Sequence, residues 1–134
     1  MTIRRRVPVV LALVAVCGLA GCVQQPRACT EIGAANGVAV EVVGLVRSEE
    51  LDVEVCLDGQ CVAAPMFADG PPETFVELPG VKSVAERTYR VTVRTPEGTV
   101  VVPSQEVVVA ASRVQPNGEG CPPTAYQARI SVRP

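Results

Sequence analysis

The six cysteines are the residues of this chain whose type and spacing most directly suggest chemistry. Histidine and tryptophan are absent. Two of them form a close pair in Cys56-Leu57-Asp58-Gly59-Gln60-Cys61. Close thiols can carry out thiol–disulfide exchange, but the oxidoreductase spacing is C-x-x-C and four residues intervene here. Four thiolates can bind zinc, although such a site needs two close pairs, whereas Cys29 and Cys121 stand alone. The remaining use of these cysteines is as structural disulfides.

The absence of histidine limits the reactions that the chain can catalyse. Histidine is the commonest general base and a principal metal ligand. A Ser-His-Asp triad, a Cys-His pair and a histidine-bearing zinc site are therefore excluded within these 134 residues. The carboxylates of Ser48-Glu49-Glu50-Leu51-Asp52 lack the EF-hand pattern and are expected to form a solvated turn. We expect no catalytic residue, no cofactor and no metal ion, and hence a protein that is not an enzyme.

The first 21 residues contain the three parts of an export signal. Arg4, Arg5 and Arg6 form a positive n-region, Val7–Val16 forms an apolar h-region, and small residues follow. The apolar run is shorter than the roughly 20 residues that cross a membrane as a helix. The sequence therefore predicts that residues 1–21 are a signal peptide.

The end of this signal, Leu19-Ala20-Gly21-Cys22, resembles the lipobox of bacterial lipoproteins. In that family the chain is cleaved before the cysteine, which carries a diacylglyceryl group and often a further acyl chain. Each buried methylene of such chains contributes about 0.8 kcal/mol to membrane binding. The resemblance implies that Cys22 is lipidated, that residues 22–36 are a lipidated tether, and that the protein is held by lipid on the extracytoplasmic face of the cell membrane.

Removal of the signal also changes the cysteine count. Cys17 is lost with the signal and Cys22 is modified, which leaves Cys29, Cys56, Cys61 and Cys121. An even number of thiols outside the cell membrane is most simply explained by two disulfides, and four cysteines allow three pairings. Asp58-Gly59 favours a tight hairpin, because glycine accepts a positive φ without steric cost. This hairpin would favour the pairs Cys56–Cys61 and Cys29–Cys121, although the other pairings stay open.

The charge of the mature chain limits its partners. Losing the three arginines of the signal lowers the 12 basic side chains to 9, against 14 acidic ones. The remaining 113 residues therefore have a formal net charge of −5 and are long enough for one small domain. This charge gives no electrostatic reason to bind nucleic acid or anionic lipid.

After residue 36 apolar residues recur with period two, which is typical of half-buried β-strands. The runs cover residues 38–43, 51–56, 74–78, 89–94, 99–102, 106–111 and 127–133. Abundant valine suits a pleated surface, and prolines are expected between the strands, because proline cannot donate to a ladder. About seven strands in residues 37–134 predict an all-β domain, an immunoglobulin-like or transthyretin-like β-sandwich.

Two proline-rich loops are candidates for function. In Ala63–Pro72, Met66 and Phe67 are expected to be exposed apolar tips of a binding loop; alternatively Phe67 packs into the edge of the sandwich. Gln115–Tyr126 is expected to follow an irregular path that is fixed by Cys121. With the lipobox and the Cys-x₄-Cys hairpin, this loop loosely resembles uncharacterised lipoproteins of actinobacteria, a resemblance that carries no known catalytic residues.

Four arginines fall on the outward positions of two predicted strands, namely Arg90, Arg94, Arg129 and Arg133. If those strands are neighbours, the arginines form a basic stripe that could meet an anionic wall polymer or an acidic patch of a partner. The alternative is that they pair across strands with Glu41, Glu54 or Glu106.

These patterns predict a non-enzymatic binding or protein–protein interaction module, anchored at the cell envelope through Cys22. Its partner would be an envelope protein or a wall polymer, and not a nucleic acid. The alternative is a secreted enzyme that works without histidine, or a thiol–disulfide redox protein that uses Cys56 and Cys61.

Overall fold

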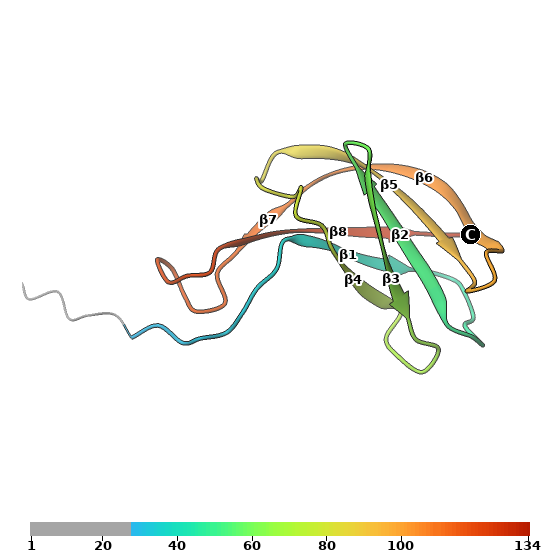
Figure 1. Ribbon diagram of the computed structural model, residues 1–134, viewed down its shortest axis with the longest axis horizontal. Coiled ribbons are helices and arrows are strands. Elements are labelled where there is room, and N and C mark those ends of the chain that lie inside the picture. The colour runs from blue at the N-terminus through green and yellow to red at the C-terminus, as the bar shows by residue number, and fades with distance from the viewer. Residues whose placement is uncertain (1–27) are drawn as a thin grey trace, which may run out of the picture.

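The part of the chain that the structure describes contains eight β-strands and no helix. In this computed structural model residues 28–134 are described, and the predicted signal peptide and Cys22 lie outside them. Two four-stranded sheets pack face to face as a β-sandwich (Figure 1). The strands are β1 Gly37–Val42, β2 Leu51–Leu57, β3 Gln60–Met66, β4 Glu73–Glu77, β5 Glu86–Arg94, β6 Val100–Ala110, β7 Ser112–Val114 and β8 Ala125–Val132. The predicted all-β sandwich is confirmed, with one strand more than expected.

The first and last strands are neighbours at the centre of one sheet. The strand order is β4-β1-β8-β7 in the first sheet and β3-β2-β5-β6 in the second. β1 and β8 run parallel over six residue pairs, from Gly37 and Gln127 to Val42 and Val132. The other ladders of the described chain are antiparallel. Parallel pairing of β1 and β8 makes both strands start at the same end of the sandwich.

The chain also joins the two sheets at their edges. Between β6 of the second sheet and β7 of the first lies a single residue, the buried Ala111, so the chain changes sheets almost without interruption. At the opposite edges, the Thr74 hydroxyl of β4 donates a hydrogen bond to the Pro65 carbonyl of β3 at 2.8 Å. Both sides of the sandwich are therefore held by direct links between the sheets.

The expectation that prolines lie only between strands is wrong. Pro65 lies inside β3 and Pro103 inside β6. Both strands are sheet edges, where one side of the backbone needs no partner and the missing N–H is tolerated. In β6, Pro103-Ser104 opposes the single residue Thr92 of β5, which makes a bulge. The bulge lets residues 99–102 and 106–111, expected as two strands, continue as one strand.

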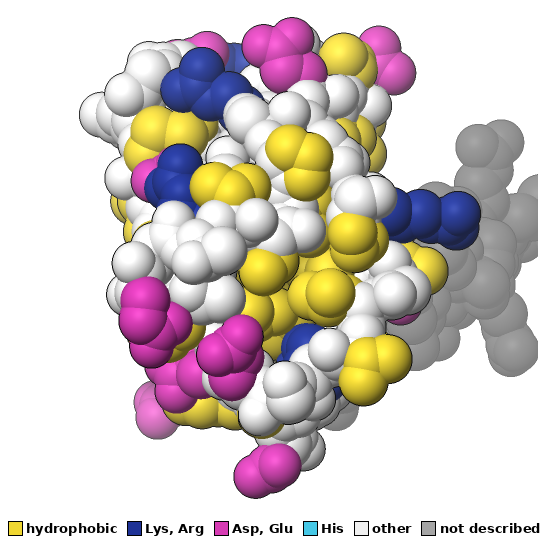
Figure 2. Space-filling model, turned by 90° about the vertical axis from the view of Figure 1, so that its right-hand side faces the viewer, with side chains coloured by type: hydrophobic (Ala, Val, Ile, Leu, Met, Phe, Trp, Pro, Cys, Tyr) yellow, Lys and Arg dark blue, Asp and Glu magenta, His cyan; other side chains and the backbone are white. Residues whose placement is uncertain are grey.

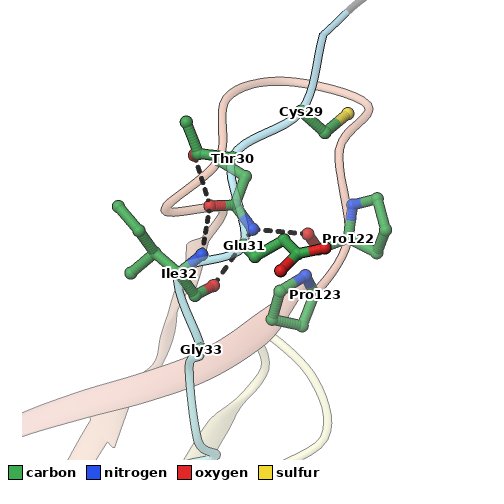
Figure 3. Close-up of a pocket in the computed structure, with 8 residues that line it drawn as sticks. Cys29, Thr30, Glu31, Ile32, Gly33, Pro122 and Pro123 are labelled. Carbon is green, nitrogen blue, oxygen red and sulfur yellow. Dashed lines mark hydrogen bonds between the residues drawn. The ribbon is translucent and has the colours of Figure 1, made fainter.

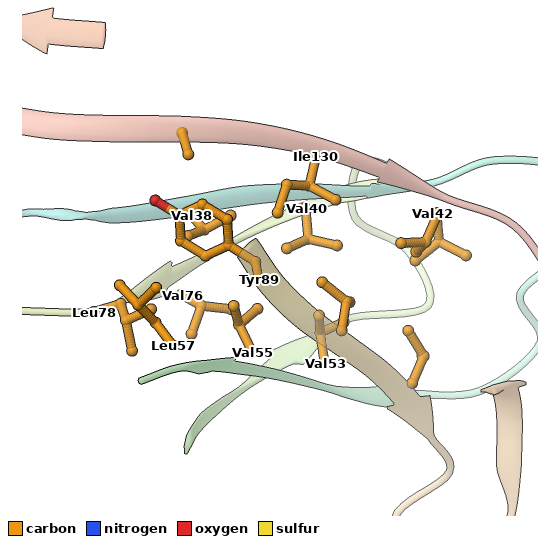
Figure 4. Close-up of a cluster of buried hydrophobic side chains, with 14 of the residues drawn as sticks. Val38, Val40, Val42, Val53, Val55, Leu57, Val76, Leu78, Tyr89 and Ile130 are labelled. Atoms are coloured by element: carbon orange, nitrogen blue, oxygen red, sulfur yellow. The ribbon is translucent and has the colours of Figure 1, made fainter. Parts of the chain in front are cut away.

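Alternation along the strands places their apolar residues in one core between the sheets (Figure 4). Valine dominates this core, and β5 contributes Tyr89, Val91 and Val93, all fully buried. Met66 is also buried, with 1% of its surface exposed. The expectation that Met66 is an exposed tip is therefore wrong, because it pairs with Leu51 in the β2–β3 ladder and shares its core-facing side.

The basic stripe predicted from four arginines does not form. Arg90 and Arg94 lie on β5 of the second sheet, whereas Arg129 lies on β8 of the first and Arg133 follows that strand. The outer faces of two packed sheets point away from each other, so the two pairs are separated. Arg94 instead forms an ion pair with Glu54 at 3.6 Å, and Arg129 pairs with Glu73. Cross-strand pairing is thus the correct alternative for Arg94.

Gly37 marks a close approach between β1 and β4. A Cβ atom at this position would lie 2.3 Å from the Val76 carbonyl oxygen and 2.6 Å from the ring Cζ of Phe75. We expect Gly37→Ala to lower the free energy of unfolding by about 1–3 kcal/mol, because a backbone oxygen can move only if the strands separate. Gly33→Ala is the matched control, since a Cβ there meets no atom within 4 Å. Urea unfolding measures both variants, and equal losses would contradict the prediction.

Tyr89 is the largest fully buried side chain, and within the described residues its hydroxyl has no hydrogen-bond partner. Burial raises the pKa of the Tyr89 phenol above its ordinary value of 10.0, because desolvation disfavours the phenolate; nearby Arg87 opposes this shift and Asp58 adds to it. As the pH rises past about 10, the unfolded chain therefore releases this proton before the folded one, and stability falls.

We expect Tyr89→Phe to remove this alkaline loss and to leave stability at pH 7 unchanged or higher, because the orphaned hydroxyl is removed. Unfolding free energies measured at pH 7 and at about pH 10.5 test this. Tyr126→Phe, at the other tyrosine of the chain, is the control, and it should leave the alkaline loss in place. A large loss of stability in Tyr89→Phe at pH 7 would contradict the prediction.

Candidate functional site

The loops of the sandwich divide between its two ends (Figure 1). One end, which we call the distal end, carries loops 43–50, 67–72 and 95–99. The other end, the proximal end, carries the β2–β3 turn, loops 78–85 and 115–124, and segment 28–36, by which the described chain enters the domain. The two ends therefore differ: the N-terminal segment packs at the proximal end, and the distal end faces away from it.

At the proximal end, the Asn117 side chain holds segment 28–36 in place (Figure 3). Its oxygen accepts hydrogen bonds from the Ile32 N–H at 2.9 Å and the Thr30 hydroxyl at 2.6 Å. Its nitrogen donates to the carbonyls of Ile32 at 3.0 Å and Pro122 at 2.6 Å. The amide thus binds both backbone groups of Ile32, as a neighbouring strand would.

The rest of the segment is held in a similar way. The side-chain oxygen of Asn36 accepts a hydrogen bond from the Tyr126 N–H at 2.8 Å, and its carbonyl accepts one from the Leu78 N–H at 2.9 Å. The Gln127 side chain donates to the Ala35 carbonyl at 3.0 Å. Segment 28–36 is therefore fixed to the domain by side-chain amides up to the first residue of β1.

Two disulfides support this arrangement. Cys29 is joined to Cys121 with a Cα–Cα distance of 5.6 Å, and Cys56 to Cys61 with a Cα–Cα distance of 4.0 Å. These are the pairs that the hairpin spacing favours. Asp58 and Gly59 have φ angles of 52° and 81°, as required at both central positions of a type I′ turn. The turn places Cys56 directly opposite Cys61 in the β2–β3 ladder.

An open hollow of about 480 Å³ lies between segment 28–33 and loop 115–124. Its polar lining consists of Thr30 and Asn117, which already bind each other, and of the Glu31 carboxylate, the one ionisable group among the lining residues (Figure 3). Across residues 28–134 no group of three or more cysteine, aspartate or glutamate residues could hold a metal ion. The same residues contain no helix long and apolar enough to cross a membrane. The hollow is therefore the outer surface of the Asn117 contacts rather than a set of converging reactive groups.

At the distal end, Arg47 joins two loops. Its guanidinium donates hydrogen bonds to the carbonyls of Phe67 at 2.7 Å and Gly70 at 2.6 Å. The planar fork of arginine suits two acceptors at once. The Gly70 N–H also bonds to the Phe67 carbonyl at 3.1 Å, and the Val42 N–H to the Pro72 carbonyl at 2.9 Å. These four hydrogen bonds therefore tie loop 67–72 to Arg47 and to the end of β1.

Apolar side chains remain exposed on this rigid end. The exposed fractions are 93% for Val46, 61% for Phe67 and 49% for Val100. Figure 2 looks at the distal end, where yellow apolar side chains gather in a central hollow and magenta carboxylates stand at its margins. Of the two predicted tips, only Phe67 contributes to this surface, because Met66 points into the core.

Arg47 has no signal in the sequence. It is an isolated arginine in a polar loop, and its role depends on a turn that lies 20 residues further along the chain. Only the turn-forming residues of loop 67–72 were visible as a pattern, and they do not indicate which side chain binds their carbonyls.

Comparisons with protein-family models, with curated proteins and with solved structures give no match to this chain. The choice of candidate site therefore rests on geometry. The exposed, apolar and rigid distal end is the surface that best fits a binding site.

The Arg47 contacts can be tested by amide hydrogen exchange. We expect Arg47→Ala to speed exchange of the Gly70 N–H by about tenfold or more, because two charge-assisted hydrogen bonds that order the turn are lost. In Arg47→Lys the exchange rate of the Gly70 N–H should lie between those of Arg47→Ala and the wild type, since an ammonium cannot bind two carbonyls with the planar fork of a guanidinium. Arg133→Ala, an exposed arginine at the same end, is the control. Unchanged exchange in Arg47→Ala would show that loop 67–72 orders itself.

Proposed function

We propose that the protein is a lipid-anchored, non-enzymatic binding module that acts at the extracytoplasmic face of the cell membrane and binds its partner at the distal end. The observation that carries this proposal is the opposition of the two ends. The chain enters at the proximal end, where the lipobox-like residues would attach it to the membrane, and the exposed loop residues Val46 and Phe67 lie at the other end.

The anchor would hold the domain close to the bilayer. Six residues separate Cys22 from the disulfide cysteine Cys29. At about 3.3 Å per residue they reach roughly 20 Å. A domain tied this closely presents its distal end away from the lipid headgroups, where a partner can approach.

Rigid loops also favour binding over catalysis. Arg47 fixes loop 67–72, and loop 95–99 is closed by bonds from the Thr95 N–H to the Thr99 carbonyl at 2.8 Å and from the Gly98 N–H to the Thr95 carbonyl at 2.9 Å. A surface that is already ordered loses little conformational entropy when it binds. The disulfide Cys56–Cys61 lies within a continuous ladder, which favours a structural role over thiol–disulfide exchange.

Intact-mass spectrometry of the protein from the cells that make it tests the anchor. We expect the mass of residues 22–134, increased by a diacylglyceryl group and reduced by four hydrogens for two disulfides. Cys22→Ala should remove the lipid mass, because the thioether cannot form. Cys17→Ala is the control, since Cys17 leaves with the signal and the mature mass should not change. An unlipidated wild-type mass would overturn the proposal.

A further inference from the structure

The distal end combines apolar side chains from three separate parts of the chain. Val46 comes from loop 43–50, Phe67 from loop 67–72, and Val100 from the start of β6. Exposed aromatic residues that are held by a rigid backbone are typical anchors at the centre of protein–protein interfaces. The Phe67 backbone is held by Arg47 through its own carbonyl, which fixes the point from which the ring projects.

The same distal loops carry exposed carboxylates. The exposed acidic residues of the three distal loops are Glu49, Glu50, Asp69 and Glu97. The basic residues at this end offset half of this charge. Arg94 pairs with Glu54, whereas Arg47, bound to two neutral carbonyls, and Arg133, beside the end of β8, each keep a positive charge, so these four carboxylates leave a net charge of −2. The distal end is therefore an apolar centre whose rim carries more carboxylates than arginines, both of which are visible in Figure 2.

We infer that the partner is a protein whose surface carries lysine or arginine side chains around an apolar pocket that receives Phe67; this inference rests on the proposed function of the distal end. Opposite charges at the rim would attract such a surface and orient it before the apolar groups meet. An anionic wall polymer would be repelled by the same rim. A second copy of this chain would bring two acidic rims together, which disfavours self-association.

Photo-crosslinking tests this inference with the full-length protein in the cells that make it. The crosslinking amino acid p-benzoylphenylalanine replaces Phe67, and in the control it replaces Val84, which is 56% exposed at the proximal end. We expect one discrete protein adduct from position 67 and none from position 84. The captured protein is then purified, and its affinity for the full-length protein is measured.

The affinity measurements show how much of the binding depends on the apolar Phe67 and how much on the acidic side chains. We expect Phe67→Ala to weaken binding at least about tenfold, as for an interface anchor, and Val84→Ala to leave it unchanged. Replacing Glu49 and Glu50 by glutamine should weaken binding about two- to fivefold at low salt, and raising the ionic strength should weaken the wild type. An affinity that changes neither with the glutamine substitutions nor with ionic strength would overturn the inference that the partner's surface is basic.

The adducts also separate the two proposals. An adduct with a wall polymer, or with a second copy of this chain, would overturn the inferred partner while leaving a binding function at the distal end. An absence of any adduct beyond the Val84 control would overturn both the partner and the proposed function. A single basic protein whose affinity depends on Phe67 supports both.

Discussion

The parallel pairing of β1 with β8 is the contact on which the rest of the structure depends. It joins the first and last strands at the centre of one sheet, so every intervening strand must fold within the loop that this pair closes. The disulfide Cys29–Cys121 links the same two regions across 92 residues of sequence. In the chain-entropy model a loop of about this length stabilises the folded state by about 4–5 kcal/mol, an upper value for a real disulfide. Both links join residues that are far apart in the sequence. Each one brings together the two regions that the other must connect, and so lowers the entropy cost of forming it.

This closure compensates for a core with few large side chains. Valine fills most of the space between the sheets, and the chain has only two phenylalanines and two tyrosines. Phe67 and Phe75 lie at the surface, so Tyr89 is the one aromatic ring that is completely buried among the described residues. Its ring fills volume that valines cannot, at the cost of a hydroxyl without a partner. The disulfides Cys29–Cys121 and Cys56–Cys61 therefore supplement packing.

Much of this fold could be predicted from local patterns. Period-two alternation identified the core-facing residues of β1, β2, β5 and β8, and Asp58-Gly59 identified the hairpin, because both signals depend on neighbouring residues alone. Sheet membership could not be predicted in this way. Alternation shows which face a residue occupies but not which strands are neighbours, so it leaves open whether the arginines of β5 and β8 share one surface. The passage of the chain between sheets at Ala111 and the bulge at Pro103 depend on distant strands. The distal end could be predicted only in part. Phe67 is exposed as expected, whereas Met66 is buried, and no sequence pattern indicates that Arg47 binds loop 67–72.

The direction of β1 and β8 determines how the domain responds to tension. β1 begins at the proximal end, next to the segment that Asn117 holds, and β8 ends at the distal end. A pull between the N-terminal segment and the C-terminal end of β8 acts along these two strands. Such a pull loads the hydrogen bonds between them in shear, all at the same time, whereas pulling a hairpin apart from its open end breaks them one after another. The contact that closes the fold is therefore also the one that resists separation of the N-terminal segment from the end of β8.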